Sequence, residues 1–398
     1  MHWRDVKLLS FDKKDSFVFF TYFASFAVIV PLSGLYLNNS GFDTKQIGII
    51  LGIATLTRVL GPYIFLFLAK IRKDLIGVGT IQCILLLVAT ILGGLFNNNV
   101  IAILALCLTN ILWVSILPNL ETVSLSYLKG DINRYSTIRM WGSIGFIFVS
   151  LWASYVIINF GSKFFWYILI VLSVLQIVSV SSLKNFGPFP VKENQRKIFR
   201  LERGLLGYYL VFFLFEMSHA PYNNFFSISL VEHGYSGLYV GSLIAFSVVC
   251  EIVTFAKGSV LLKYFDVNRI LIFCAITAAI RWLLLEYYIS NLFLLTFSQL
   301  LHSFTFALYH ICAMHVLSRN ATQDVLGLRQ TTYTVFTMGI AAAIGSYLSG
   351  ILWHNVLLNV SSFITVGVFS AIISLLLVIF IMISERKHKN TLNYYKIN

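Results

Sequence analysis

Charged residues are scarce in this chain, and acidic residues are the scarcer of the two signs. Of its 398 residues, 11% are Asp, Glu, Lys or Arg, and 29 Lys and Arg stand against 16 Asp and Glu. Soluble domains carry about 25% charged residues. Here 58% of the residues are hydrophobic, with 35 Phe and 20 Tyr. This composition excludes an ordinary soluble globular protein and is typical of a chain that lies in lipid.

Cysteine is also rare, and the familiar patterns of metal or catalytic chemistry are missing. The cysteines form no CxxC pair and no cluster with histidine, so neither a disulfide framework nor a metal site is expected. No phosphate-binding loop or nucleophile–base pair is visible. We therefore expect no enzyme activity and no cofactor. The five cysteines, all within apolar stretches, are Cys83, Cys107, Cys250, Cys274 and Cys312.

Long apolar stretches separated by short polar ones fill the rest of the chain. A helix needs roughly 20 apolar residues to cross a bilayer core of about 30 Å, because backbone groups cannot be left unpaired in hydrocarbon. The sequence therefore predicts an all-α membrane protein with twelve transmembrane helices. The predicted spans are 16–37, 45–68, 76–96, 100–127, 137–158, 164–183, 205–230, 237–262, 269–288, 292–317, 328–352 and 361–383.

The basic residues gather on one side of these spans. Most Lys and Arg fall in the N-terminal segment, the even-numbered loops and the C-terminal tail, whereas Lys45 and Lys163 fall on the opposite side. The positive-inside rule therefore predicts a multi-pass protein of the bacterial inner membrane with both termini in the cytoplasm. This topology explains the positive net charge, so the lipid bilayer is an expected partner and nucleic acid is not.

The chain divides into two halves that share a weak internal repeat. The longest polar interruption, 184–204, is basic and separates six spans from six. We predict two pseudo-symmetric six-helix bundles, 1–183 and 205–398, joined by this cytoplasmic linker. Because the copies have the same orientation, their symmetry axis runs along the membrane normal. At an offset of 193, the identical pairs include Phe19 and Phe212, Ser25 and Ser218, Gly41 and Gly234, and Gly48 and Gly241.

Several charged residues fall inside predicted spans. The repeat offset places Arg58 over Glu251, each about thirteen residues into its span, and Arg139 and Arg281 are two further arginines. An intramembrane charge costs at least about 2.5–3.5 kcal/mol on insertion scales, so such residues usually serve a pathway or a partner. For Arg58 a purely structural ion pair is equally open.

Two polar stripes accompany these charges. Glu216, His219 and Asn223 have the spacing of one helical face, and a second stripe runs through 299–309. Such stripes can mean only hydrogen bonds between helices, worth roughly 0.6 kcal/mol each. Two stripes at matching depth, each with a titratable member, favour a hydrated cavity. The members of the second stripe are Gln299, His302, Thr305, Phe306 and Tyr309.

These residues carry a resemblance to a known family. Over essentially its whole length the chain resembles the major facilitator superfamily, and within it the branch of lactose permease and the 3-phenylpropionate transporters. The most specific blocks are 138–146, which contains Arg-Met-Trp-Gly-Ser, and 299–306. Further blocks are 41–48, 58–62, 218–220, 225–227, 234–236, Glu251 and 281–282. The resemblance implies alternating access to a midplane site between two bundles.

Residue by residue, the resemblance to lactose permease holds only in part. Glu121 and Arg139 match the carboxylate and arginine that bind sugar, and Arg281 and His302 match members of the proton pathway. Thr305, however, stands where that permease has a carboxylate, so its proton machinery is not reproduced and lactose is not the expected substrate.

A second departure lies in the loop after the second predicted span. Lys70 stands where the superfamily motif has a gating Asp, while the basic Arg72 and Lys73 are retained. Either the cytoplasmic gate is weaker here or another ion pair replaces it.

We therefore expect proton symport of a small aromatic carboxylate by a protein that functions as a monomer. Glu251 is the first candidate for the proton-binding carboxyl, with Arg281 or Arg139 as its partner, His302 as relay and Glu216 as a further titratable group. Arg139 is expected to pair with the anionic head of the substrate. The full set of substrate-binding candidates is Glu121, Arg139, Arg58, His219, Asn223, Gln299, Thr305 and Tyr309.

Other functions stay open on the same residues. Within transport, the alternatives are a sugar or nucleoside proton symporter, or an exporter of small organic molecules. A nutrient sensor without transport activity is a different class, because fold does not fix function. Such sensors usually carry long soluble extensions, and the tails of this chain are short.

Overall fold

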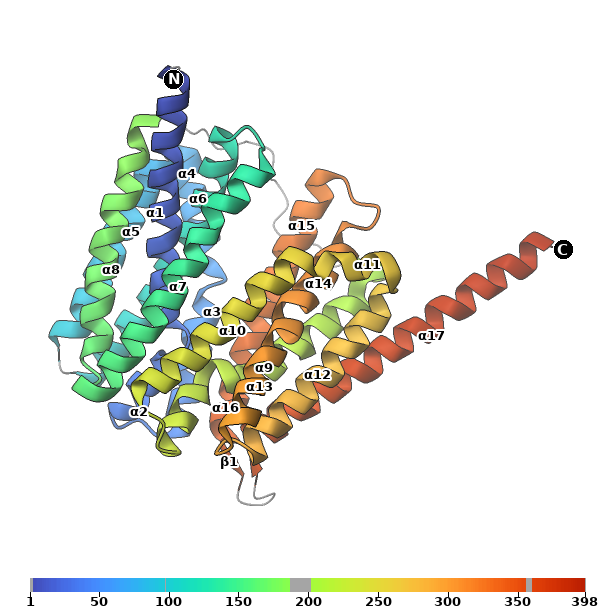
Figure 1. Cartoon of the computed structure of the whole chain (residues 1–398). Coiled ribbons are helices and arrows are strands. Elements are labelled where there is room, and N and C mark those ends of the chain that lie inside the picture. Colours follow the sequence, from blue (N-terminus) through green and yellow to red (C-terminus); the bar gives the residue numbers. More distant parts are fainter. Residues whose placement is uncertain (1–2, 97, 187–201, 356–359, 398) are drawn as a thin grey trace. The chain divides into compact units, whose positions relative to one another are not determined.

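The computed structural model describes residues 3–96, 98–186, 202–355 and 360–397, and these residues are overwhelmingly helical (Figure 1). A short antiparallel hairpin joins β1 (His354–Asn355) to β2 (Val360–Ser361). The helices are α1 (Trp3–Ile29), α2 (Ser33–Asn39), α3 (Thr44–Thr57), α4 (Leu60–Arg72), α5 (Leu75–Leu95), α6 (Asn99–Tyr127), α7 (Ile132–Phe160), α8 (Phe164–Ser181), α9 (Leu206–Glu232), α10 (Gly237–Lys257), α11 (Leu261–Tyr264), α12 (Val267–Tyr287), α13 (Leu292–Ser303), α14 (Tyr309–Ser318), α15 (Gln323–Thr334), α16 (Ala342–Ile351) and α17 (Phe369–Ile397).

Helices occupy all twelve predicted spans. Ten helical segments of the described residues are long and apolar enough to cross a membrane, and the pair Leu9–Ile29 and Ser33–Asn39, bent by 41°, is an eleventh. The twelfth is α9, which is 27 residues long but is not among those ten. Its polar members include the stripe predicted at Glu216, His219 and Asn223. The prediction of an all-α membrane protein is confirmed, and the count of twelve holds when the bent pair and α9 each count as one span.

Some spans are less regular than predicted. The second is interrupted between α3 and α4, and Arg58 lies at the interruption. Pro62 lies in the first turn of α4, where a missing N–H leaves no intrahelical bond unmade. A π-helical turn, Phe304–Leu308, separates α13 from α14 directly after His302. Such turns change which side chains face a neighbouring helix and often occur at functional sites.

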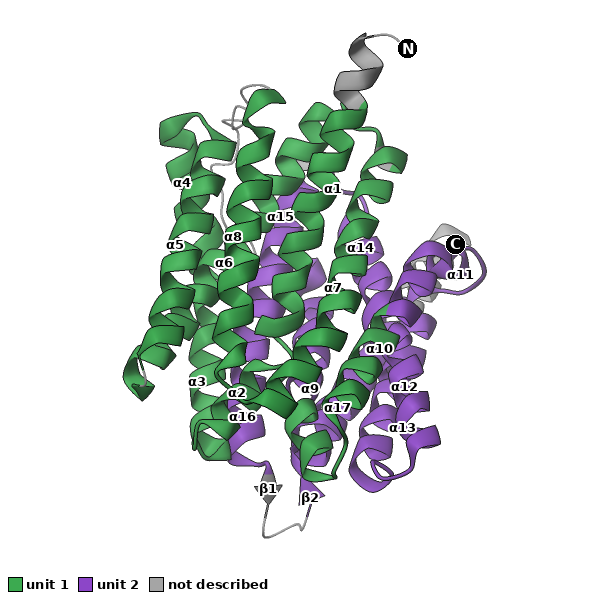
Figure 2. Ribbon diagram, turned by 60° about the vertical axis from the view of Figure 1, so that its left-hand side comes forward, with its two compact units in different colours: residues 1–194, 223–248 green, residues 195–222, 249–398 purple. Residues whose placement is uncertain are grey.

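The chain forms two compact units, shown in different colours in Figure 2. Unit 1 comprises residues 1–194 and 223–248, and unit 2 comprises residues 195–222 and 249–398. The end of α9 and the start of α10 therefore pack with the first part of the chain. The predicted halves are defined by the internal repeat, and they stay a prediction. Most of the predicted linker lies outside the described residues.

Helices of unit 1 approach each other closely where glycine allows it. Helix α1 packs along α7, and α5 packs against α6 and α8. A Cβ on Gly34 of α2 would lie 1.9 Å from the Asn224 carbonyl oxygen of α9, and one on Gly145 of α7 would lie 2.4 Å from the Phe20 carbonyl oxygen. Ser227 also donates to the Pro31 carbonyl at 2.7 Å. At these positions, backbone carbonyl groups of one helix closely approach a helix that is far away in the sequence.

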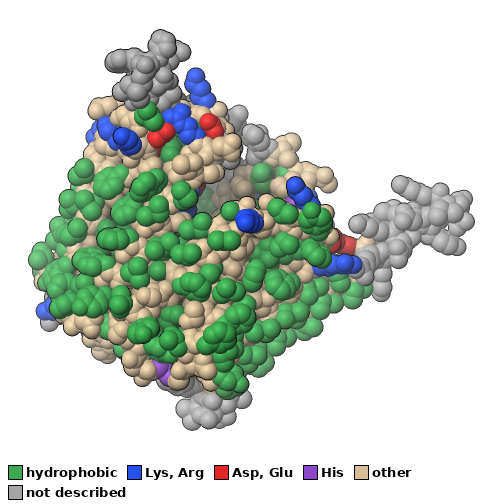
Figure 3. Space-filling model, in the orientation of Figure 1, with side chains coloured by type: hydrophobic (Ala, Val, Ile, Leu, Met, Phe, Trp, Pro, Cys, Tyr) green, Lys and Arg blue, Asp and Glu red, His purple; other side chains and the backbone are tan. Residues whose placement is uncertain are grey.

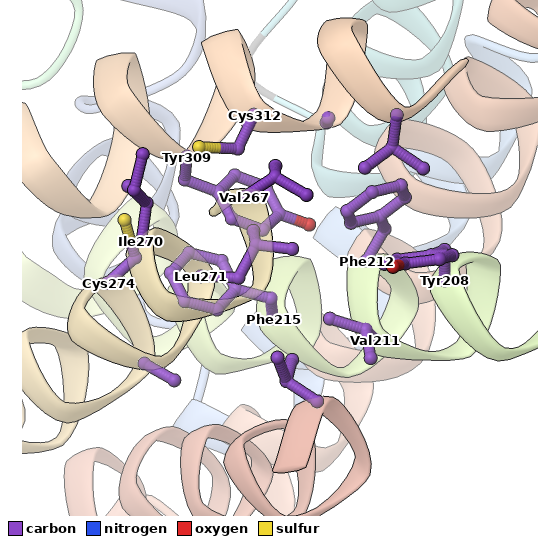
Figure 4. Packing of buried hydrophobic residues seen from close by; sticks show 14 of the residues in the cluster. Tyr208, Val211, Phe212, Phe215, Val267, Ile270, Leu271, Cys274, Tyr309 and Cys312 are labelled. Carbon is purple, nitrogen blue, oxygen red and sulfur yellow. The ribbon is translucent and has the colours of Figure 1, made fainter. Parts of the chain in front are cut away.

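The core of unit 2 is aromatic. Tyr208, Phe212 and Phe215 of α9 point toward α12 and α14 in Figure 4 and are at most 5% exposed. Tyr309 stacks on Phe215 with ring centroids 3.9 Å apart. Cys274 also belongs to this cluster and is fully buried, so it packs as a small apolar residue.

The outward-facing helix flanks are apolar as well. Figure 3 shows hydrophobic side chains over these flanks, with many of the Lys and Arg near helix ends. Phe148 of α7 is 61% exposed and Phe380 of α17 is 69% exposed. Large exposed hydrophobic surfaces are rare in soluble monomers but are required where the surrounding solvent is lipid.

Candidate functional site

The residues predicted to carry protons meet inside unit 2. His302 of α13 and Glu251 of α10 approach each other to 2.7 Å between Nε2 and Oε1, and their side chains are only 11% and 12% exposed. Among the described residues, His302 is the one ion-pair partner of Glu251 within 4 Å. Nδ1 of His302 is buried without a hydrogen-bond partner. A carboxyl and an imidazole at this distance can share one proton.

Arg281 lies beside this pair and is fully buried. Its Nε donates to the Ser298 carbonyl at 3.1 Å and its Nη1 to the Thr305 hydroxyl at 3.4 Å, while Nη2 has no partner among the described residues. The guanidinium lies 4.1 Å from the centroid of the Tyr222 ring and 4.6 Å from that of Trp282. The aromatic faces attract its positive charge.

The polar stripe of α9 also reaches this group. Nδ1 of His219 lies 2.9 Å from the Phe215 carbonyl, and its ring centroid lies 6.5 Å from that of His302. Tyr222, one turn further along α9, donates to Gln299 of α13 at 2.8 Å. The predicted residues His219 and Gln299 are therefore brought together with the proton-binding candidates.

Other predicted members of the stripes lie elsewhere. Tyr309 belongs to the aromatic core of unit 2, where its hydroxyl is buried without a partner. Glu216 lies near Tyr309 and Tyr333. Asn223 is partly buried and belongs to the portion of α9 that packs with unit 1.

A second polar group lies in unit 1 and contains the predicted pair Glu121 and Arg139. The Tyr135 hydroxyl donates to Glu121 Oε1 at 3.1 Å. The Arg139 guanidinium lies 3.8 Å from the centroid of the Phe23 ring and 5.6 Å from that of Phe19. Glu121 and Arg139 are near enough for their charges to interact, but no ion pair within 4 Å joins them in the described chain. An arginine on aromatic faces, with its counter-ion at a distance, can accept another anion.

Arg58 is held in place by an amide. Its Nε donates to Asn110 Oδ1 of α6 at 2.7 Å, and the Asn110 Nδ2 donates to the Leu106 carbonyl at 2.8 Å. The guanidinium also lies 5.9 Å from the centroid of the Trp113 ring. Trp113 in turn stacks on Tyr22 of α1.

Two ion pairs lie at the ends of helices. Arg134 of α7 binds Asp12 of α1 through two nitrogens, at 2.8 and 2.7 Å. Both Arg134 nitrogens donate to Oδ2 of Asp12, whereas Arg329 of α15 donates to the two different oxygens of Glu202, at 3.1 and 2.7 Å. Each pair joins elements of one unit. No ion pair of Lys70 shorter than 4 Å occurs among the described residues.

The site contains residues that sequence reasoning did not select. Asn110, Tyr135 and Tyr222 are the hydrogen-bond partners of Arg58, Glu121 and Gln299. All three are uncharged and lie among many similar residues, so composition does not distinguish them. Helical spacing could have indicated Tyr222, because it follows His219 by three residues and so lies on the same face of the helix.

With this geometry established, a family can be assigned. The model of the MFS_1 like family matches residues 14–365. The chain belongs to this family. It is a transporter of the major facilitator superfamily, as the resemblance implied.

A relative and several solved structures agree with the MFS_1 like assignment. The chain is 24% identical over 347 residues to the probable 3-phenylpropionic acid transporter of Escherichia coli (strain K12), covering 84% of this chain and 89% of that one. A variant of nucleoside transporter NupG superposes with a TM-score of 0.78 at 16% identity, covering 93% of this chain and 98% of that one. The D-xylose-proton symporter gives a TM-score of 0.69 at 13% identity, covering 93% and 97%. At such identities the solved structures establish the fold alone.

This MFS_1 like protein is therefore a multi-pass membrane protein and a secondary transporter of a small solute. Its family and its relatives are transporters rather than enzymes.

Proposed function

We propose that this protein is a proton symporter for a small aromatic carboxylate, acting as a monomer in the bacterial cytoplasmic membrane with both termini inside. Its Escherichia coli relative is named a probable 3-phenylpropionic acid transporter, and this name supports an aromatic acid as substrate. The phenylalanine rings beside Arg139 suit such a molecule, since rings can hold its ring and the guanidinium its head.

The observation that carries the proposal is the 2.7 Å contact between Glu251 and His302. Both side chains are nearly removed from water, and the fixed charge of Arg281 lies close by. A carboxyl holds or releases its proton according to whether a cation stands next to it. Small movements of α10, α12 and α13 during alternating access would thus load and unload Glu251, with His302 as the relay.

Substrate binding is proposed for the polar group of unit 1. Arg139 receives the carboxylate, while Glu121, held by Tyr135, orients it. Arg58 adds a second positive charge, fixed by Asn110. Polar contacts of substrate or water with His219, Asn223, Gln299 and Thr305, and proton binding by Glu216, stay predictions. Tyr309 lies in the aromatic core of unit 2 and is given no such contact.

The decisive variant is Glu251→Gln, which keeps the shape of the side chain but cannot ionise. We expect it to abolish uptake of labelled 3-phenylpropionate driven by a pH gradient in proteoliposomes, yet to permit exchange of substrate between equal pools. The matched control is Glu232→Gln, because Glu232 is exposed at the end of α9. Gradient-driven accumulation by the Glu251 variant at the wild-type level would contradict the assignment.

A further inference from the structure

Asp15 is a buried acid that none of the roles above uses. It lies in α1 of unit 1 and is fully buried. Both carboxyl oxygens lack a hydrogen-bond partner among the described residues. An ionised carboxylate in such a place loses its hydration without compensation, which costs several kcal/mol in real proteins and is rarely tolerated.

The basic groups around Asp15 are engaged elsewhere. Arg134 of α7 directs two nitrogens at Asp12. Lys14 donates from Nζ to the Ser182 carbonyl at the end of α8 and lies 5.1 Å from the centroid of the Phe186 ring. Asp12, one turn before Asp15, adds a like charge that disfavours a second carboxylate.

The other helices that pack on α1 contribute polar groups but no nearby cation free for Asp15. Tyr135 of α7 lies close enough to interact with it and donates its only proton to Glu121. Arg139, further along α7, stands over Phe19 and Phe23. Further titratable groups on these elements are Lys13 of α1, which is exposed, Tyr127 of α6, whose ring pairs with that of Phe11, and Lys184 after α8.

No neighbouring side chain compensates an ionised Asp15. The Ser124 hydroxyl of α6 lies near the Asp15 carboxyl but donates to the Leu120 carbonyl at 2.8 Å. No hydrogen bond within 3.5 Å joins either Asp15 oxygen to another described residue. A buried carboxyl without a donor or a cation beside it is favoured in its neutral, protonated form.

We propose that Asp15 is a second proton-binding site, in unit 1 and separate from Glu251. The acid holds its proton in this buried position and releases it where alternating access brings water to this part of α1. Because Tyr135 interacts with both Asp15 and Glu121, this proton is placed next to the proposed substrate group. The role of Asp15 in proton coupling rests on the proposed function, whereas its protonation does not.

Infrared spectroscopy tests the protonation directly and needs no transport. The purified wild type at neutral pH should show a carbonyl band of a protonated acid that is absent from Asp15→Asn and retained in the control Asp43→Asn, since Asp43 is an exposed helix cap whose role Asn can fill. Absence of an Asp15-dependent acid band would overturn the proposal. Should Asp15→Asn fail to fold, Asp15→Glu must move the band to the frequency of a glutamic acid; an unmoved band also overturns the proposal.

Reversal-potential measurements in proteoliposomes test coupling. Wild type and Asp15→Asn are compared, and the variant should move one proton fewer per substrate while still transporting. An unchanged ratio would remove Asp15 from coupling even if Glu251→Gln behaves as proposed. If wild type shows no proton coupling at all, the proposed function fails while the infrared result for Asp15 still stands.

Discussion

Three of the arginines within the predicted spans have different surroundings. Arg58 is bound by an amide, Arg139 stands over two phenylalanine rings, and Arg281 donates to a carbonyl and a hydroxyl. A guanidinium with neutral polar or aromatic partners can still bind an incoming anion. A bidentate carboxylate partner would neutralise its charge and occupy its donors. The surroundings of Arg139 and Arg281 therefore matter more to the function than the presence of three positive charges.

Replacement of Arg139 should weaken binding of an acid but not of a neutral analogue. A guanidinium–carboxylate pair is worth about 1.5–3 kcal/mol, so Arg139→Ala should raise the Kd of 3-phenylpropionate by roughly 10- to 100-fold. Arg139→Lys should recover part of this, because lysine keeps the charge but loses the fork. Calorimetric binding of the acid and of the matching alcohol provides the comparison. Equal losses for both ligands would refute a carboxylate role for Arg139.

At the scale of elements, backbone contacts fix how helices approach. The Asn224 carbonyl of α9 lies where a Cβ on Gly34 of α2 would have to go. Gly34→Ala should therefore force these segments apart and destabilise the protein by about 1–3 kcal/mol, as overpacking does. Thermal unfolding in detergent is the measurement. Gly204→Ala is the matched control, since nothing lies within 4 Å of a Cβ there; equal melting temperatures for both variants would contradict the close contact.

The ion pair between Arg329 and Glu202 is a second contact that holds α15 in place. Arg329 also donates to the Leu317 and Arg319 carbonyls, which closes the end of α14. Its side chain is 10% exposed, so solvent screens these bonds little. Arg329→Ala should cost about 1.5–3 kcal/mol, because buried carbonyls and a carboxylate lose their donor. Thermal unfolding of Arg329→Ala, with Arg319→Ala as control, measures this, and a loss no larger than the control's would show that the pair is unimportant.

At the scale of the whole molecule, the topology can be tested without knowing the substrate. Single cysteines placed at position 5 and at position 390 of a variant lacking the five native cysteines should react with a membrane-impermeant maleimide only after intact cells are permeabilised. The positive-inside distribution is the physical reason, because basic loops resist translocation. Labelling of either tail in intact cells would overturn the predicted orientation.

Much of the fold was predictable because lipid imposes simple requirements. Apolar length identified the helices, and the positions of 16–37 and 45–68 were correct although both spans are broken in the structure. The breaks depend on local backbone geometry around Pro31 and Arg58, to which a hydropathy window is blind. The packing of 223–248 with unit 1 was not predictable either, since it depends on contacts between residues far apart in sequence.

The sequence by itself determined the solvent of this protein, its helices and the rarity of its buried charges, because each is a property of composition along one stretch of chain. Tertiary structure alone decided which charges meet. It placed His302 on Glu251, left Nη2 of Arg281 without a hydrogen-bond partner among the described residues, and buried both Asp15 oxygens without one. Such pairings are governed by distances of a few ångströms between different helices, and spacing within a single helix carries no record of them.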